Sequence, residues 1–150
     1  MQDIKEKLYL LCLSFIEQRI QTAETALEQS REASNDDTKS SAGDKFETTR
    51  EMMAQDISRS KSLLMDAQQN LQLLNAIKDT PKNDRVRNGN LVYTSQGAFY
   101  ISISAGQLHL DGESIFAISA ASPIGKLLIG KQKGDTFAFN GKDYLLNNII

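Results

Sequence analysis

The sequence predicts an α+β protein in which a long antiparallel α-helical hairpin is followed by a small β-rich body with one short helix. The first proline is Pro81, and a single glycine, Gly43, precedes it, so little interrupts helices in the first half. Beyond residue 90, short β-branched and aromatic runs alternate with glycine-containing turns, as in a sheet. We therefore expect a hairpin at residues 1–79, a linker at 80–90 and a body at 91–150.

Each half of the predicted hairpin carries one apolar stripe. Apolar residues recur at steps of three and four, the spacing of one helix face. The first stripe slips by one residue between Phe15 and Ile16, and the second has the polar residues Arg50 and Ser60 at its two weak positions. The first stripe comprises Ile4, Leu8, Leu11, Phe15, Ile16, Ile20, Ala23 and Leu27, and the second comprises Phe46, Met53, Ile57, Leu64, Ala67, Leu71 and Leu74. The second stripe is close to a seven-residue repeat, which predicts that the helices pair as a coiled coil.

The bend between the helices is rich in acids. Residues 34–37, "SNDD", are expected to end the first helix because Ser, Asn and Asp favour loops. Ser41 is expected to cap the second helix. Acids in a first helical turn interact favourably with the helix dipole, which gives Asp44 and Glu47 a purely structural explanation. Phe46 is expected to lie in the core.

The body carries turn and cap signals. Ser122, Pro123 and Gly130 predict a short helix with a Ser N-cap, Pro at its first position and Gly after its end. Asn140-Gly141 predicts a type I′ hairpin turn. Four strands are expected before the short helix, in the runs 90–95, 98–103, 107–111 and 114–119.

Composition excludes several kinds of site. With one cysteine and one histidine, a zinc site is not expected. Cys12 lies in the first stripe, which predicts a small core residue, and His109 lies in an alternating run, which predicts a solvated strand position. A lone cysteine forms no internal disulfide, and no apolar run reaches membrane-spanning length, so we expect a cytoplasmic protein with no membrane contact.

The two halves differ in charge. Residues 1–80 contain ten Lys/Arg and fourteen Asp/Glu, whereas residues 81–150 contain seven and five. The second half is too weakly basic for independent DNA binding.

Three motifs resemble those of the bacterial GreA/GreB transcript cleavage factors. The run "SPIGKLLIGKQKGDTFAF" is similar to the C-terminal signature of that family, "VRNGNLVY" to the start of the same domain, and "GDKFE" to the Gly-Asp-x-x-Glu hairpin tip. The resemblance implies a coiled coil that enters the secondary channel of RNA polymerase and an FKBP-like domain that docks on the channel rim. It also implies an accessory factor, not an enzyme, that meets the nascent RNA 3′ end only inside the polymerase.

The resemblance implies roles for individual residues. Asp44 and Glu47 match the two family acids that hold a Mg²⁺ ion shared with the polymerase during cleavage of backtracked RNA. No cofactor is expected on the chain alone. Ser122, Pro123, Ile124 and Gly125 are expected to serve the fold, with contact to the polymerase as a second role.

The tip departs from the family pattern. Residues 48–51 read Thr-Thr-Arg-Glu where the family usually has Asn-Ala-Glu-Tyr, and residues 34–41 form an extra stretch. This stretch makes Asp36 and Asp37, expected as helix-stop residues, alternative acids at an acidic tip around residues 34–47. Inhibition of the polymerase by occupying its channel, without cleavage, therefore stays open. A peptidyl-prolyl isomerase, suggested by the FKBP-like body, and a coiled-coil adaptor are further alternatives.

Overall fold

The computed structural model describes the backbone of residues 2–40 and 44–150, and the side chains of residues 4–33 and 48–150. The fold is α+β, with two long helices followed by a six-stranded sheet and one short helix. The chain divides into two compact units. The sheet unit comprises Met1–Phe15 and Gln72–Ile150, and the helical unit comprises Ile16–Leu71.

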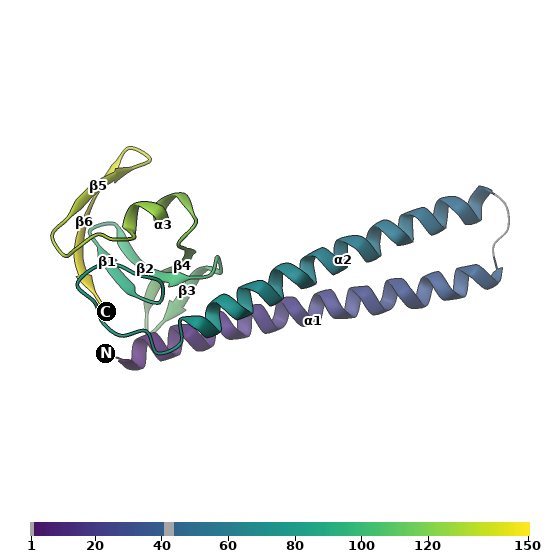
Figure 1. Ribbon diagram of the computed structural model, residues 1–150, viewed down its shortest axis with the longest axis horizontal. Helices are drawn as coiled ribbons and strands as arrows, with labels where there is room; N and C mark the ends of the chain where they lie inside the picture. The colour runs from purple at the N-terminus through teal and green to yellow at the C-terminus, as the bar shows by residue number, and fades with distance from the viewer. Residues whose placement is uncertain (1, 41–43) are drawn as a thin grey trace. The chain divides into compact units, whose positions relative to one another are not determined.

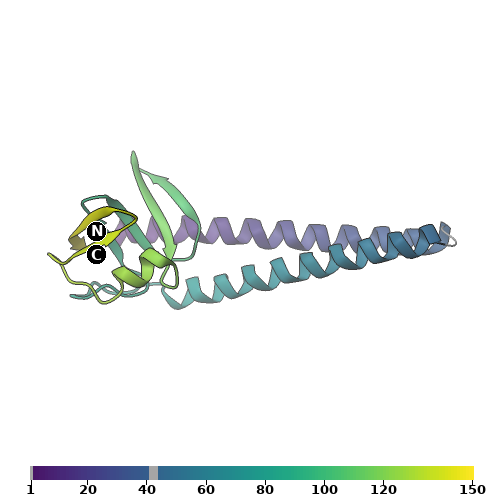
Figure 2. The same cartoon turned by 90° about the horizontal axis from the view of Figure 1, so that it is seen from above.

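The helical unit consists of parts of two helices, α1 (Gln2–Ser40) and α2 (Asp44–Ala76). Within this unit the two helices lie beside one another in both views (Figures 1 and 2). Each helix buries one line of small and apolar residues, which are Ile16, Ala23 and Leu27 in α1 and Ser60 and Ala67 in α2. The buried residues of the helical unit therefore lie on the two predicted stripes. Ser60 occupies a position of the second stripe at which the sequence has a polar residue.

The end of the first helix differs from expectation. Residues 34–37 do not end the first helix, because α1 continues to Ser40. The low helix propensity of Ser, Asn and Asp amounts to less than about 0.7 kcal/mol per residue relative to Ala, and a long helix with a buried stripe tolerates that cost. The exposed apolar residues Met52, Leu63 and Met65 of α2 lie outside the predicted stripe, as expected.

The sheet unit contains six strands in the order β3-β4-β2-β1-β6-β5. The strands are β1 (Leu91–Thr94), β2 (Gly97–Ser102), β3 (Gly106–Leu110), β4 (Glu113–Ser119), β5 (Thr136–Phe139) and β6 (Lys142–Ile149). Neighbouring strands are antiparallel except β2 and β4, which pair in parallel with Phe99 opposite Phe116. The four expected runs thus correspond to β1–β4, and the expected pairing of the C-terminus is confirmed by the bond from the Ile150 N–H to the Leu91 carbonyl, 2.8 Å.

Both faces of the sheet are covered within this unit. On one face, α3 (Pro123–Leu128) packs over a core that includes Phe99, Ile101, Leu128, Tyr144 and Leu146. On the other face, Ser102 contacts Cys12 of α1. Because side chains alternate along a strand, β2 contributes to both cores and is buried along almost its whole length.

The predicted turn and cap residues take the expected conformations. Ser122 is the N-cap of α3, and Pro123 is its first residue. Asn140 and Gly141 both have positive φ, 51° and 77°, as a type I′ turn between β5 and β6 requires.

The segment 80–90, expected as a linker, packs on the sheet unit. The Val86 N–H donates to the Lys131 carbonyl at 2.9 Å, and the Gly130 N–H donates to the Val86 carbonyl at 2.9 Å. Asn90 is fully buried, with its side-chain amide donating to the Pro81 and Ile150 carbonyls at 3.3 and 3.2 Å. The segment is therefore held on the sheet by several hydrogen bonds, and it is more than a flexible connection.

In the part of the chain that the structure describes, no helix combines the length and apolar content needed to cross a membrane.

Candidate functional site

The predicted acidic tip lies where α1 ends and α2 begins. α1 ends at Ser40 and α2 begins at Asp44, so only residues 41–43 connect the helices. Residues 41–43, which include the predicted cap Ser41 and Gly43, lie outside the described part of the chain, as do the side chains of Asp36, Asp37, Asp44, Phe46 and Glu47.

The four acids of the predicted tip lie close to the two helix ends that residues 41–43 connect. Asp44 is the first residue of α2, and Glu47 lies one turn further on. Asp36 and Asp37 lie in α1, about one turn before its end. At a rise of about 1.5 Å per residue, the backbones of all four acids lie within about 6 Å of a helix end, measured along the axis. The extra stretch at 34–40 thus lengthens α1 and does not insert a long loop before Asp44.

The acids at this end of the helices suit a hard divalent cation. Carboxylate oxygens are the protein ligands that Mg²⁺ prefers, and Mg²⁺ usually takes only one or two of them. Among the side chains that the structure describes, residues 4–33 and 48–150, no group of three or more His, Cys, Asp or Glu could hold a metal ion. The fit of Mg²⁺ to this chain therefore rests on the chemistry of the donors at 36, 37, 44 and 47.

The Ser122–Gly125 motif builds the start of α3. The Ser122 Oγ donates to the Ser119 carbonyl at 2.6 Å and accepts from the Gly125 N–H at 3.1 Å. A Cβ at position 125 would overlap the Ser119 carbonyl oxygen, so only glycine fits there. Ile124 packs against the core under α3, and Pro123 is exposed. The structural role of the motif is confirmed, and its contact with a partner stays a prediction.

Cys12 and His109 occupy the positions that the sequence predicts. Cys12 is fully buried, and burial raises the pKa of its thiol. His109 is an exposed residue of β3 whose Nδ1 lies 3.3 Å from the Ser114 Oγ of β4, a cross-strand pair. This pair is open to solvent, whereas nucleophilic catalysis relies on preorganised groups in a water-excluded site. Neither residue indicates an active site.

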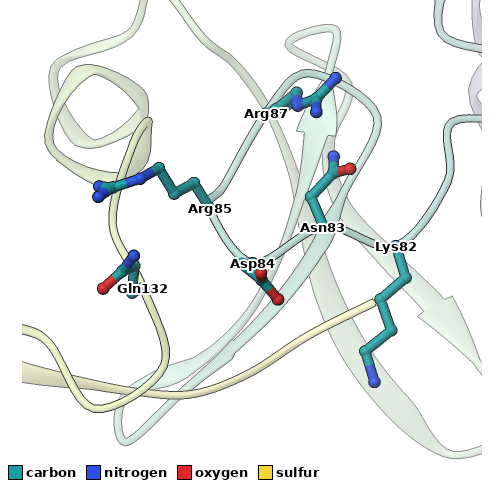
Figure 3. Close-up of a pocket in the computed structure, with 6 residues that line it drawn as sticks. All are labelled: Lys82, Asn83, Asp84, Arg85, Arg87 and Gln132. Atoms are coloured by element: carbon teal, nitrogen blue, oxygen red, sulfur yellow. The ribbon is translucent and has the colours of Figure 1, made fainter.

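Sequence reasoning missed a cluster of basic residues on the sheet unit. Lys82, Arg85 and Arg87 line an open hollow of about 650 Å³, together with Asn83, Asp84 and Gln132. Figure 3 shows the Arg85 side chain reaching toward the segment that carries Gln132, where its Nη1 donates to the Gly130 carbonyl at 3.1 Å. The sequence feature that could have identified this cluster is the close spacing of Lys and Arg in residues 82–87. The composition of that segment indicated only a linker.

Comparison of the chain with protein-family models, with curated proteins and with solved structures gives no match in any of the three.

Proposed function

We propose that this protein is a GreA/GreB-like transcription elongation factor, which inserts its paired helices into the secondary channel of RNA polymerase. One observation carries the proposal: only three residues join α1 to α2, and acids lie within about one turn on both sides of them. The end of a narrow two-helix structure is a shape suited to a channel. Acids there would meet the active centre of the enzyme that the channel serves.

We further propose a coiled coil for the helical unit and an FKBP-like domain for the sheet unit. The buried stripes of α1 and α2, with Ser60 and Ala67 at small positions, suit a coiled coil. The sheet with α3 on one face suits an FKBP-like domain that docks on the channel rim. In this proposal, Pro123 is the exposed residue of the Ser122–Gly125 motif that is available for such docking.

Cleavage of backtracked RNA would use the tip carboxylates as metal ligands. Asp44 and Glu47 would hold a Mg²⁺ ion shared with the polymerase, while the other ligands come from polymerase, water and RNA phosphate. Such an ion supplies an activated water and stabilises the leaving oxygen. The role of the two side chains is to orient this water toward the scissile phosphodiester at the RNA 3′ end. Asp36 and Asp37 are the alternative ligands.

Inhibition without cleavage is the second candidate function, and the tip sequence favours it. Arg50 stands where the family usually has Glu, and its side chain is exposed on α2 one turn beyond Glu47. A cation beside the carboxylates competes with a metal ion for them. In this case the helices would occupy the channel and obstruct it.

Position-specific cross-linking tests entry into the channel for both candidates. Met52 and Met65 are equally exposed on α2, at 61% and 60%, and Met52 lies nearer the connection to α1. Because Cys12 is buried, Met52→Cys and Met65→Cys each present one reactive thiol for a benzophenone label. We expect the label at 52 to cross-link deep in the secondary channel of the cognate polymerase and the label at 65 to cross-link nearer its mouth.

Two results would overturn the proposal. The first is absence of any cross-link to polymerase from both labelled proteins, provided that both retain wild-type helicity. The second is a cross-link from both labels to the outer surface of the polymerase alone. Recovery of a different protein with the labelled chain would favour the adaptor alternative.

A further inference from the structure

We infer that the sheet unit carries a docking site for an acidic segment of a partner protein that also presents an apolar side chain. The site is the basic surface, which we define as residues 82–87 and 126–133. This inference rests on the sheet unit alone and does not depend on the proposed function.

The basic surface concentrates the positive charge of the second half of the chain. Residues 81–150 contain seven Lys/Arg, and six of them fall on the basic surface: Lys82, Arg85, Arg87, Lys126, Lys131 and Lys133. Asp84 is the one acid in these two segments. Among the described side chains, the ion pairs join Lys7 to Asp111 and Arg59 to Asp56, so they involve none of the six cations. Their charge is therefore available to an external anion.

Backbone pairing holds the two segments together. Arg85 and Gln132 form an isolated β-bridge, and Val86 exchanges hydrogen bonds with Gly130 and Lys131. The Val86 side chain between them is 1% exposed and belongs to the core under α3. The backbone that carries these cations is therefore fixed before a ligand binds. This lowers the entropy cost of ordering the site on binding.

Two of the cations are also held by their side chains. The Arg85 Nη1 donates to the Gly130 carbonyl at 3.1 Å. When the Asn83 amide is oriented to satisfy its neighbours, its oxygen accepts from the Arg87 Nε at 3.1 Å. The guanidinium NH₂ groups of Arg87 remain for a ligand. A guanidinium offers paired donors that match a carboxylate.

A second hollow adds an apolar component beside the first. It has a volume of about 440 Å³ and is lined by Val86, Arg87, Asn88, Ala120, Lys126 and Ile129. Arg87 lines both hollows. Ile129 is 39% exposed there, so an apolar side chain of a ligand would find a partner next to two cations.

This combination favours an acidic peptide over a nucleic acid. The residues that line the two hollows include no aromatic side chain on which bases could stack, although stacking is the usual source of single-strand affinity. The whole chain carries a net charge of -2, which opposes a long polyanion more than a short acidic segment. Asp84 lies inside the first hollow, so the carboxylates of a ligand must lie to either side of it.

A labelled peptide tests the inference on the full chain. The probe is a fluorescein-labelled peptide with one leucine between two runs of four glutamates, and a second probe has serine in place of leucine. We expect the leucine peptide to bind at low salt, about fivefold more tightly than the serine peptide. In a nitrogen–proton correlation spectrum, binding should shift the amide signals of the basic surface.

Matched charge reversals provide the control. Arg87→Glu and Lys126→Glu should each weaken the leucine peptide about tenfold. Lys142→Glu makes the same charge change near the β5–β6 turn, outside both hollows, and should change affinity less than about twofold. Circular dichroism must show that all three variants are folded.

Three outcomes would overturn the inference. They are no binding of the leucine peptide, equal weakening by Lys142→Glu, and tighter binding of a twenty-nucleotide oligothymidylate than of the leucine peptide. The last outcome would identify the basic surface as a nucleic-acid site.

Discussion

The Cys12 sulfur in α1 lies 3.6 Å from the Ser102 hydroxyl oxygen at the end of β2, and both residues are buried. These residues are 90 positions apart in the chain. Their contact joins the start of the first helix to the central part of the sheet. Tyr9 adds a second tertiary contact from the same helix, because its hydroxyl donates to the Asn75 Oδ1 at 2.9 Å.

Burial of Cys12 predicts a protected thiol. Burial raises the pKa of this thiol, while the Ser102 hydrogen bond opposes the rise. The reactive thiolate is therefore scarce at neutral pH, and a reagent has no access. With Ellman's reagent at pH 8, we expect the folded protein to react at least about a hundredfold more slowly than the protein unfolded in guanidinium. Equal rates would show that Cys12 is exposed.

Alkaline pH should destabilise the sheet unit through Tyr100. Burial is the largest cause that raises the pKa of its phenol above the ordinary value. Because the folded pKa is the higher one, the contribution of Tyr100 to stability is complete below about pH 10 and is lost as the pH rises further. The free energy of unfolding in urea should fall between pH 8 and pH 10.5. This fall should be smaller for Tyr100→Phe, and identical falls in the two proteins would contradict the assignment.

Lys5 should change the free energy of unfolding with pH in the opposite direction. Burial lowers the pKa of its amine, whose Nζ donates to the Thr80 carbonyl at 2.6 Å. Stability therefore rises as the pH increases from the lowered folded pKa toward the ordinary lysine value. Lys5→Met should remove this rise, and the comparison at pH 8 and pH 10.5 separates it from the effect of Tyr100.

Among the polar residues, replacing Asn90 should lower the free energy of unfolding most. Its oxygen accepts from the Arg87 N–H at 2.8 Å, and its amide donates to two carbonyls. Asn90→Ala removes all three hydrogen bonds of a fully buried side chain and should lower the free energy of unfolding by about 2–4 kcal/mol. The exposed neighbour Asn88 serves as the control, and Asn88→Ala should cost under about 0.5 kcal/mol. Equal costs for the two variants would mean that segment 80–90 acts as a mere connection.

Replacing Gly125 by a larger residue should destabilise the protein. A Cβ there would overlap the Ser119 carbonyl oxygen, so Gly125→Ala must displace the backbone and should cost about 1–3 kcal/mol. Lys126→Ala, on the next residue of α3, should cost less than about 0.5 kcal/mol. Urea unfolding monitored by circular dichroism measures both. A neutral Gly125→Ala would show that the close packing of α3 on Ser119 is not required.

Local signals predicted most of the sheet unit. Ser122 and Pro123 identified the start of α3, and Asn140-Gly141 identified the last hairpin turn, because each depends on the backbone of a few adjacent residues. The parallel pairing of β2 with β4 depends on contacts distant in the chain, and no local pattern encodes it.

Other features depend on tertiary context. Residues 34–37 looked like a helix end because propensity acts locally, yet α1 runs to Ser40. The basic surface was missed because 82–87 and 126–133 are distant in the chain and meet only through tertiary contacts, which include the Arg85–Gln132 bridge and the hydrogen bonds of Val86. Asp44 and Glu47 were selected by a motif, and their position at the start of α2 agrees with the expected helix start.

The most direct test of the central proposal is RNA cleavage in a stalled, backtracked elongation complex of the cognate polymerase, with purified protein and Mg²⁺. We expect short 3′ RNA fragments with the wild-type protein. Asp44→Asn and Glu47→Gln should each slow their release by about a hundredfold or more while binding persists. Asp66→Asn, at an exposed position of α2, should have no effect. Equal activity of all three variants would contradict the role of Asp44 and Glu47. Release of no fragments by the wild-type protein would contradict cleavage and would favour inhibition of the polymerase without cleavage.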